Sequence, residues 1–160
     1  MTAPAGGDLV EVQLLQIPVQ LWARSQEQHD ALMREFALMS VPTEPGEKER
    51  HVPTRLLELI DTLNADFEGV STEQEKALEA AAAAGVESLD LVYRIPAAAA
   101  PASQALGAML DEADEYCRQG QHLLTLAPDE DLVRFRWWFL DQFIGQTEGK
   151  SPVAWPDYTR

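Results

Sequence analysis

The chain has 160 residues, of which 46% are hydrophobic and 24% charged, and these proportions are typical of one globular domain with a sizeable core. Its formal net charge of -15 would repel nucleic acid and anionic membranes, so we expect neither as a partner. Because Cys117 is the single cysteine, no disulfide can form within the chain. The sequence has no secretory pattern and no apolar run of membrane-spanning length. We therefore expect a soluble, cytoplasmic protein.

The N-terminal part of the sequence predicts one strand and one long helix. Apolar and polar residues alternate over residues 9–17, as in a strand with one buried face, and Pro18 ends the pattern. Helical spacing of apolar residues follows over about 19–39. Residues 41–53 contain three prolines and a glycine, which predicts an exposed loop.

The middle of the sequence predicts two further helices. Apolar residues at helical spacing predict a helix over about 54–68, which Gly69 closes. Either Ser71 or Thr72 can cap the next helix, and Ser71 followed by Gln74 has the spacing of a capping box. Residues 77–84 of that helix are mostly alanine, which favours a helix but buries little area, so we expect it at the periphery.

A second strand and two more helices are predicted in the C-terminal half. Residues 89–95 alternate as a strand that stops at Pro96, and a helix is expected over about 101–118. Apolar and aromatic residues over 132–144 fall in two adjoining helical stripes, so we expect this helix to be covered on more than one side. Proline at 128 and the three carboxylates that follow suit the start of a helix.

Together these patterns predict an α+β, mainly helical fold with about five helices and a small two-stranded sheet in a single domain. The sequence predicts three segments: a flexible N-terminus over 1–8, one globular domain over 9–150 and a tail over 151–160. The tail contains prolines and Trp155, which either folds back on the core or contacts a partner.

The sequence offers little evidence of catalysis. His29 lies among apolar residues of the first helix, where a histidine is more often structural than a ligand. Asp111 and Glu115 share one helical face, but no histidine pair has metal-ligand spacing. Cys117 lies on the inward side of its helix, where thiols are usually inert. No phosphate-binding or nucleophile motif occurs, so we expect no enzyme activity, no metal and no cofactor.

Three segments resemble a known family. They are DEADEYC at 111–117, LLTL at 123–126 and FRWWFL at 135–140, together with the tail motif P-x-x-W-P at 152–156. The chain resembles small actinobacterial accessory proteins associated with anti-sigma-factor kinases and their STAS-domain antagonists. This resemblance implies regulation of a sigma factor by protein contact, with a STAS-domain protein or anti-sigma kinase as the partner. The kinases' D-x-G-x-G loop is absent from the sequence, so the resemblance implies an accessory rather than the kinase.

Three hypotheses about function follow. The first is a non-enzymatic regulatory or adaptor protein, whose partner contacts would include Asp111, Glu112, Glu115 and Trp155. The second is a small-ligand sensor with an aromatic pocket lined by Tyr93, Arg136, Trp137 and Trp138. A cavity beside the aromatic helix predicted over 132–144 would favour this hypothesis. The third is a metal-dependent enzyme that uses Asp111, Glu115 and a histidine. The oligomeric state does not follow from the sequence.

Overall fold

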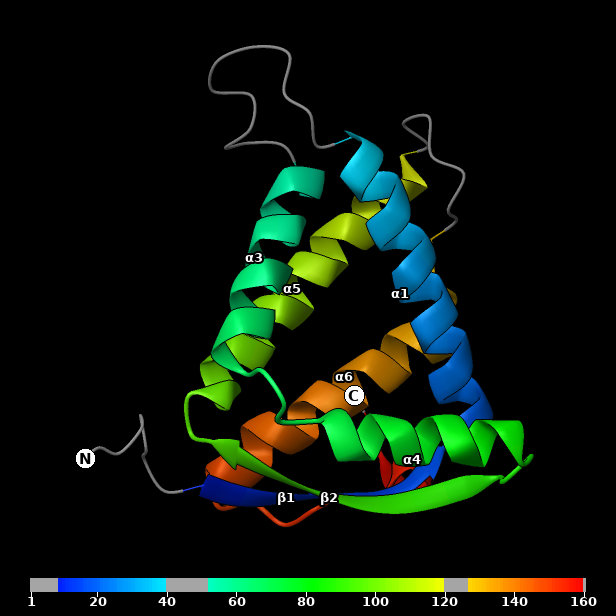
Figure 1. Ribbon diagram of the computed structural model, residues 1–160, viewed down its shortest axis with the longest axis vertical. Helices are drawn as coiled ribbons and strands as arrows, with labels where there is room; N and C mark the ends of the chain where they lie inside the picture. The colour runs from blue at the N-terminus through cyan, green and yellow to red at the C-terminus, as the bar shows by residue number, and fades with distance from the viewer. Residues whose placement is uncertain (1–8, 40–51, 120–126, 160) are drawn as a thin grey trace.

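The computed structural model describes residues 9–39, 52–119 and 127–159. Within these residues the chain forms a mainly helical α+β domain with five α-helices and one two-stranded antiparallel sheet, which confirms the predicted fold class (Figure 1). The elements in chain order are β1 (Leu9–Pro18), α1 (Val19–Met39), α3 (Val52–Asp66), α4 (Thr72–Ala83), β2 (Ser88–Pro96), α5 (Ala99–Arg118), α6 (Glu130–Thr147) and the short 3-10 helix η1 (Trp155–Asp157). None of these helices is both long and apolar enough to cross a membrane.

The sheet has one buried face, and a β-bulge keeps the apolar residues of β1 on it. Between Leu14 and Ile17 the register shifts, so β1 carries one residue more than β2. Gln16 in the bulge has a positive φ of 57°, and its backbone N–H donates to Asp90 Oδ1 at 2.7 Å. Because of this extra residue, Leu14 and Ile17 are both fully buried.

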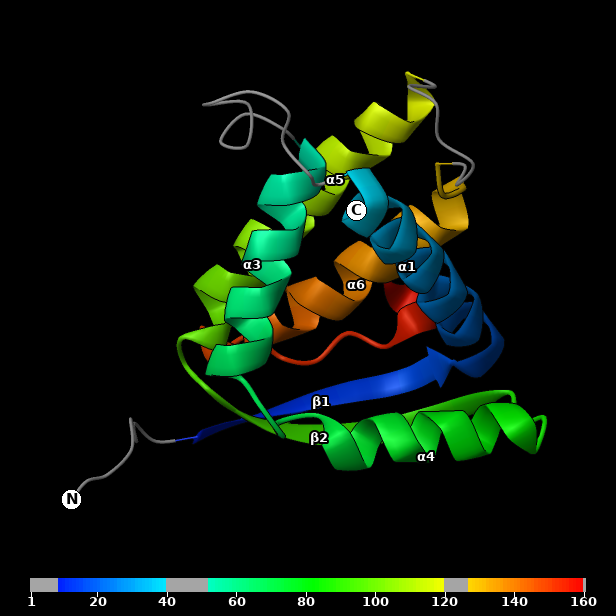
Figure 2. The same cartoon turned by 45° about the horizontal axis from the view of Figure 1, so that its top comes forward.

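The sheet forms the base of the molecule, and the helices stand on it or run along it. Contacts join α4 to β2 and α6 to β1, while α1, α3 and α5 rise from the base and approach one another at the far end (Figures 1 and 2). The side chain of Gln146 on α6 donates to the backbone C=O of Gln13 and accepts from its N–H, both at 2.8 Å. These two bonds pair backbone groups of β1 that β2 does not reach.

This arrangement produces two separate hydrophobic cores. The base core lies between the sheet, α6 and the lower ends of α1 and α4, and its fully buried members include Trp138, Leu14, Ile17 and Leu78. The apex core joins the far ends of α1, α3 and α5 through Leu32, Phe36, Leu56, Leu110, Ala113 and Cys117. Helices α1 and α5 therefore contribute to both cores, and Phe67, directly after α3, packs against the base core.

Three helix starts differ from the sequence-based prediction, and one of them is α5, which begins at Ala99 rather than about residue 101. Helix α3 begins at Val52 and ends at Asp66, so Val52 and Pro53 are helical rather than part of the predicted loop; the rest of that loop lies outside the described residues. Proline fits the first turn of a helix because no intrahelical partner exists there for its missing N–H. For α6 the cap is Asp129, whose Oδ1 accepts from Leu132 N at 3.0 Å, and Pro128 precedes the cap.

The predicted capping box at the start of α4 is wrong. The Ser71 hydroxyl donates to the carboxylate of Glu75 at 3.1 Å and makes no cap bond with the helix backbone. The amide of Gln74 donates to the backbone C=O of Val92 on β2 at 2.8 Å. The Gln74 bond thus joins α4 to β2, whereas the Ser71 bond stays within the start of α4; the local sequence pattern reveals neither.

The C-terminal segment, predicted as a separate tail over 151–160, packs against α6 as far as Thr159. The indole N–H of Trp138 donates to the backbone C=O of Val153 at 2.8 Å, and the Tyr158 hydroxyl donates to Asp141 Oδ2 at 2.6 Å. Trp155 lies edge-on to Trp138, with 5.7 Å between ring centroids. Residues 151–159 are therefore part of the same packed unit. The predicted N-terminal segment 1–8 lies outside the described residues.

Candidate ligand-binding site

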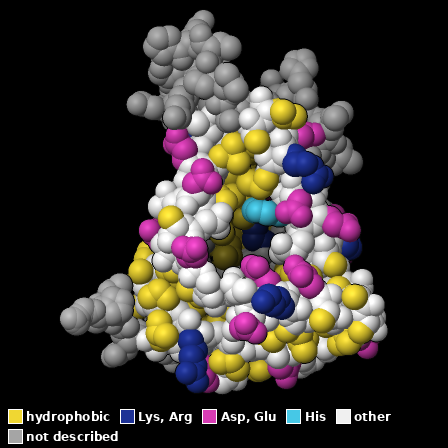
Figure 3. All heavy atoms as spheres, viewed as in Figure 1, with side chains coloured by type: hydrophobic (Ala, Val, Ile, Leu, Met, Phe, Trp, Pro, Cys, Tyr) yellow, Lys and Arg dark blue, Asp and Glu magenta, His cyan; other side chains and the backbone are white. Residues whose placement is uncertain are grey.

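A hollow opens between the two cores, and α1, α3, α5 and α6 surround it. Figure 3 shows this face of the molecule, with hydrophobic and acidic side chains and a histidine around the depression. The hollow has two adjoining lobes, because several residues line both. The residues shared by the two lobes are Trp22, Gln26, Leu63, Asn64, Glu75, Leu106, Phe139 and Leu140.

The larger lobe has a volume of about 500 Å³ and lies against the base core. We call it the aromatic lobe because it is lined by Trp22, Phe67, Tyr93, Phe139 and Phe143. The ring of Tyr93 packs edge-to-face on both Phe139 and Phe143, with centroids 6.0 and 5.2 Å apart. These contacts orient three of the rings relative to one another.

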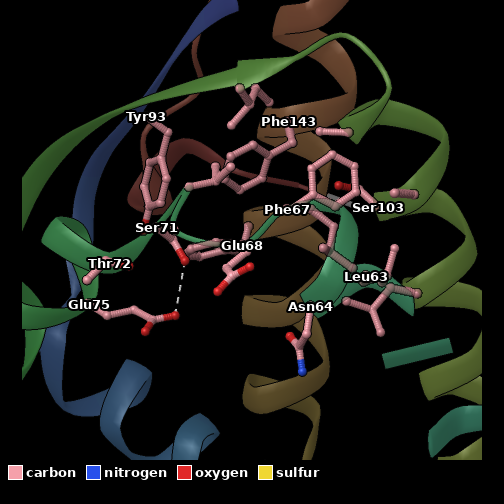
Figure 4. A pocket seen from close by; sticks show the side chains of 18 of the residues that line it. Leu63, Asn64, Phe67, Glu68, Ser71, Thr72, Glu75, Tyr93, Ser103 and Phe143 are labelled. Atoms are coloured by element: carbon pink, nitrogen blue, oxygen red, sulfur yellow. Dashed lines mark hydrogen bonds between the residues drawn. The ribbon is translucent and has the colours of Figure 1, made fainter. Parts of the chain in front are cut away.

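Polar side chains line the rest of the aromatic lobe. The Tyr93 hydroxyl, the carboxylates of Glu68 and Glu75, and the hydroxyls of Ser71 and Ser103 belong to residues around it (Figure 4). Burial, and secondarily the charge of Glu75, raises the pKa of Tyr93, so its phenol stays protonated as a donor. The lobe thus combines a wide apolar wall with a few polar groups, as small-molecule sites usually do.

The smaller lobe, which we call the histidine lobe, has a volume of about 320 Å³. Ser25, Gln26 and His29 of α1 line one side, and Arg136 of α6 lines another. Burial lowers the pKa of His29, outweighing the opposing effect of Asp30. His29 is therefore neutral at pH 7 and presents one donor and one acceptor nitrogen.

The hollow follows from the pattern of side chains along α1. The inner face of this helix begins with Trp22, which joins the base core, and ends with Leu32 and Phe36, which join the apex core. Between them the inner face carries small or polar residues, Ser25, Gln26 and His29. These side chains cannot supply the apolar area that would draw the neighbouring helices inward. The two cores therefore form at the ends of the helices and leave the middle open.

The turn that joins α3 to α4 supplies a further part of the wall. Gly69 has φ of +78°, a conformation that favours glycine, and Val70 N donates to Phe67 O at 3.2 Å. This turn brings Phe67, Glu68 and Ser71 to the aromatic lobe. Because the turn depends on Gly69, the orientation of the lobe's acidic and aromatic side chains depends on it as well.

The four residues predicted to line one pocket are not brought together. Tyr93 lines the aromatic lobe and Arg136 the histidine lobe, whereas Trp137 lines a separate surface depression beside Asp111. Trp138 is fully buried in the base core. Consecutive helical residues point about 100° apart, so the two indoles could not share one pocket.

The predicted acidic contact residues are paired with arginines. Asp111 and Asp114 both contact Arg136 Nη2 at 2.6 Å, and Asp111 also accepts from the indole of Trp137. Glu112 pairs with Arg55 at 3.1 Å and Glu115 with Arg118 at 3.2 Å, and both pairs are exposed. Asp111 thus joins α5 to α6 and Glu112 joins α5 to α3, whereas the Glu115–Arg118 pair lies within α5. The negative charge of these predicted contact residues is therefore largely neutralised.

Among the carboxylates of residues 111–115 on α5, only Asp114 is deeply buried, at 3% exposure. Burial raises its pKa, while the hydrogen bond and charge of Arg136 oppose the shift. The arginine itself retains a buried Nε without a hydrogen-bond partner among the described atoms. This cluster is an internal connection between α5 and α6.

Trp155, the fourth predicted partner contact, is folded back onto the core. It contacts the rings of Phe135 and Trp138 at centroid distances of 5.8 and 5.7 Å, and the Arg134 guanidinium lies 4.3 Å from its ring centroid. Of the two alternatives for this side chain, the structure supports the anchor.

The proposed metal ligands do not meet. Within the described part of the chain, no group of three or more His, Cys, Asp or Glu side chains is placed to hold a metal ion. Asp111 is paired with Arg136 and Glu115 with Arg118, while His51 and His122 lie outside the described residues. Burial raises the pKa of the Cys117 thiol to about 11, which keeps it protonated and weakly nucleophilic.

Comparisons of this chain with protein-family models, with curated proteins and with solved structures give no match. The resemblance to accessory proteins of sigma-factor partner switching therefore stays a prediction.

Proposed function

We propose that this chain is a non-enzymatic regulatory protein that binds a small, largely apolar molecule in the hollow. The aromatic lobe is the observation that carries the proposal. Its volume of about 500 Å³ falls within the roughly 300–1,000 Å³ range of small-molecule sites. Five aromatic side chains from α1, the α3–α4 turn, β2 and α6 converge on it. The lobe lies beside α6, the aromatic helix, and a cavity there supports the sensor hypothesis.

Packing energetics favour an occupant. Protein interiors are close-packed, and a void takes attractive contacts away from the side chains that line it. Trp22, Tyr93 and Leu78 line the aromatic lobe although each also belongs to the base core. An apolar ligand that displaced water from these surfaces would restore the missing contacts.

The position of the hollow suggests how a ligand would be sensed. It lies between the apex core and the base core, so an occupant would contact α1, α3, α5 and α6 together. A ligand that bound one spacing of α1, α3 and α5 more tightly would shift the population toward that spacing. A protein partner that contacts these helices would respond; the resemblance implies a STAS-domain protein or an anti-sigma kinase.

The proposal is tested by filling the hollow. Ala102 of α5 lines the aromatic lobe, whereas Ala105 on the same helix is exposed and does not. We expect the neutral solvatochromic dye Nile red to bind the native protein saturably, and Ala102→Phe to weaken this binding at least about tenfold by occupying the site. Ala105→Phe is the matched control and should bind like the native protein.

Binding is measured by dye fluorescence, and folding of each variant by circular dichroism. The absence of saturable dye binding to the native protein would contradict the proposal. A folded Ala102→Phe variant with native affinity would contradict it as well, because the dye would then occupy another surface.

A further inference from the structure

The aromatic lobe carries two carboxylates and no positive charge among its described lining residues. Glu68 lies in the α3–α4 turn and Glu75 on α4, and both line the lobe. Neither forms an ion pair with a lysine or arginine of the described chain. This differs from the 111–115 cluster, where each carboxylate has an arginine partner. The charge of Glu68 and Glu75 is therefore available to an occupant of the lobe.

One of these carboxylates is held in place beside the rings. The Ser71 hydroxyl donates to Glu75 Oε1 at 3.1 Å, the bond drawn in Figure 4. The charge of Glu75 contributes to the raised pKa of Tyr93, which places the carboxylate within electrostatic reach of that phenol. The Tyr93 ring makes T-shaped contacts with Phe139 and Phe143, and all three rings line the same lobe as Glu75.

Aromatic faces and carboxylates attract the same kind of ligand. The face of an aromatic ring carries negative electrostatic potential and attracts a cation, most strongly where water is excluded. Two unpaired carboxylates add a Coulombic attraction for positive charge and repel anions. The rings also supply apolar area, which a small hydrated metal ion would not use.

We infer that the ligand of the aromatic lobe is a lipophilic organic cation, such as an amine or a quaternary onium ion with an aromatic or alkyl body. This inference rests on the proposed function and specifies the class of molecule that the site selects. The cationic centre lies toward Glu68 and Glu75, and the apolar body lies against Tyr93, Phe139 and Phe143.

The first test compares two probes of nearly the same shape and opposite charge, tetraphenylphosphonium and tetraphenylborate. We expect calorimetry to show saturable binding of the cation to the native protein and at least about tenfold weaker binding of the anion. Competition by the cation with Nile red would place it in the same hollow. Equal affinity for the two probes, or preference for the anion, would overturn the inference.

The second test separates the lobe carboxylates from the overall negative charge. The double variant Glu68→Gln and Glu75→Gln removes both carboxylates from the lobe with little change in shape. The control double variant, Glu73→Gln and Glu79→Gln, removes the same charge from exposed positions on α4 outside the hollow. We expect the lobe variant to weaken phosphonium binding about tenfold and the control less than about twofold.

Nile red distinguishes failure of this inference from failure of the proposed function. If the dye binds the native protein and is lost in Ala102→Phe, but the lobe and control variants bind phosphonium alike, the hollow is a ligand site without cation selectivity. If neither the dye nor the phosphonium ion binds the native protein, both proposals are overturned. Unchanged dye affinity in the lobe variant, with reduced phosphonium affinity, supports both.

Discussion

Arg136 shows how one side chain determines the packing of two helices. Its guanidinium lies 2.6 Å from both Asp111 and Asp114, and Asp114 is almost wholly buried. A buried carboxylate with a charge partner is tolerated, but the same carboxylate without its partner is strongly destabilising. The pair therefore contributes to the specificity of the α5–α6 contact more than to net stability.

We expect Arg136→Met to lower the free energy of unfolding by about 3–5 kcal/mol, because it removes the charge that compensates Asp114. Chemical denaturation at neutral pH measures this loss. Arg94→Met is the control, since Arg94 is exposed on β2, and should change stability by less than about 0.5 kcal/mol. Adding Asp114→Asn to Arg136→Met should recover part of the loss; a single-variant loss below about 1 kcal/mol would contradict this account.

His29, which lines the hollow, makes the stability of the folded protein depend on pH. Its pKa in the folded protein lies below the ordinary value of 6.5, so the unfolded chain binds the proton more readily. The stabilisation from neutral His29 is therefore complete above pH 6.5 and is lost as pH falls through the lowered folded pKa. We expect the stability advantage of the native protein over His29→Gln to shrink between pH 7.5 and 5. Urea titrations of both proteins across this range test it, and an advantage independent of pH would refute it.

Sequence patterns identified few residues of the candidate site. Tyr93 and Arg136 do line the hollow, but Trp137 and Trp138 are used for structural contacts. Glu68 and Glu75 look like ordinary surface charges in the sequence, and only the turn at Gly69 places them beside aromatic rings. One feature of the sequence does indicate the hollow: polar residues interrupt the apolar face of α1 between Trp22 and Leu32.

At the scale of elements, a close helix contact occurs where α5 crosses α6. Gly107 of α5 is buried against the ring of Trp137, and a Cβ at this position would lie 2.4 Å from Trp137 Cη2. The indole cannot easily move, because its N–H donates to Asp111 at 3.1 Å. A glycine in the middle of α5, which costs helix propensity, is thus explained by the space that Trp137 needs.

Gly107→Ala should destabilise the protein by about 1–3 kcal/mol, although alanine is favoured over glycine within a helix by about 1 kcal/mol. Thermal or chemical unfolding gives the value. Gly145→Ala on α6 is a matched control, because its added Cβ would meet only the side chain of Lys150, with Cδ at 3.4 Å and Cβ at 3.7 Å. That variant should be neutral or more stable by up to about 1 kcal/mol. Similar effects of the two substitutions would show that the Trp137 contact is not tight.

The elements themselves were predictable because their signals are local. Strand alternation and helical spacing identified β1, α1, β2, α5 and α6 to within about three residues. Helix α3 was placed two residues late because proline suits both a loop and a first turn. The β-bulge at Gln16 and the angles between helices depend on contacts distant in sequence, so the hollow could not be derived from periodicity.

At the scale of the whole molecule, the hollow and the docked C-terminal segment lie at different parts of α6. Phe139, Leu140 and Phe143 line the aromatic lobe, while Arg134, Trp138 and Asp141 hold residues 153–158. One helix therefore joins the candidate site, the sheet and the C-terminus. A change at the C-terminal segment is expected to affect the stability of the whole domain rather than of that segment alone.

Trp155 tests this expectation. The side chain contacts Phe135 and Trp138 and lies under the Arg134 guanidinium. Because it is only partly buried, we expect Trp155→Ala to lower the free energy of unfolding by about 2–4 kcal/mol, near the low end of buried aromatic truncations. Asp157→Asn, an exposed change in the same short helix, should alter stability by less than about 0.5 kcal/mol.

Denaturation of the native protein and of Trp155→Ala, followed by tryptophan fluorescence and by far-UV circular dichroism, tests cooperativity as well as stability. If the C-terminal segment belongs to the domain, the two probes should give one coincident transition in each protein, shifted to lower denaturant in the variant. The reason is that Trp138, which the segment covers, is fully buried in the base core and cannot be exposed without loss of that core. Separate transitions in the native protein, or a shift of less than about 1 kcal/mol in the variant, would show that the segment unfolds independently of the domain.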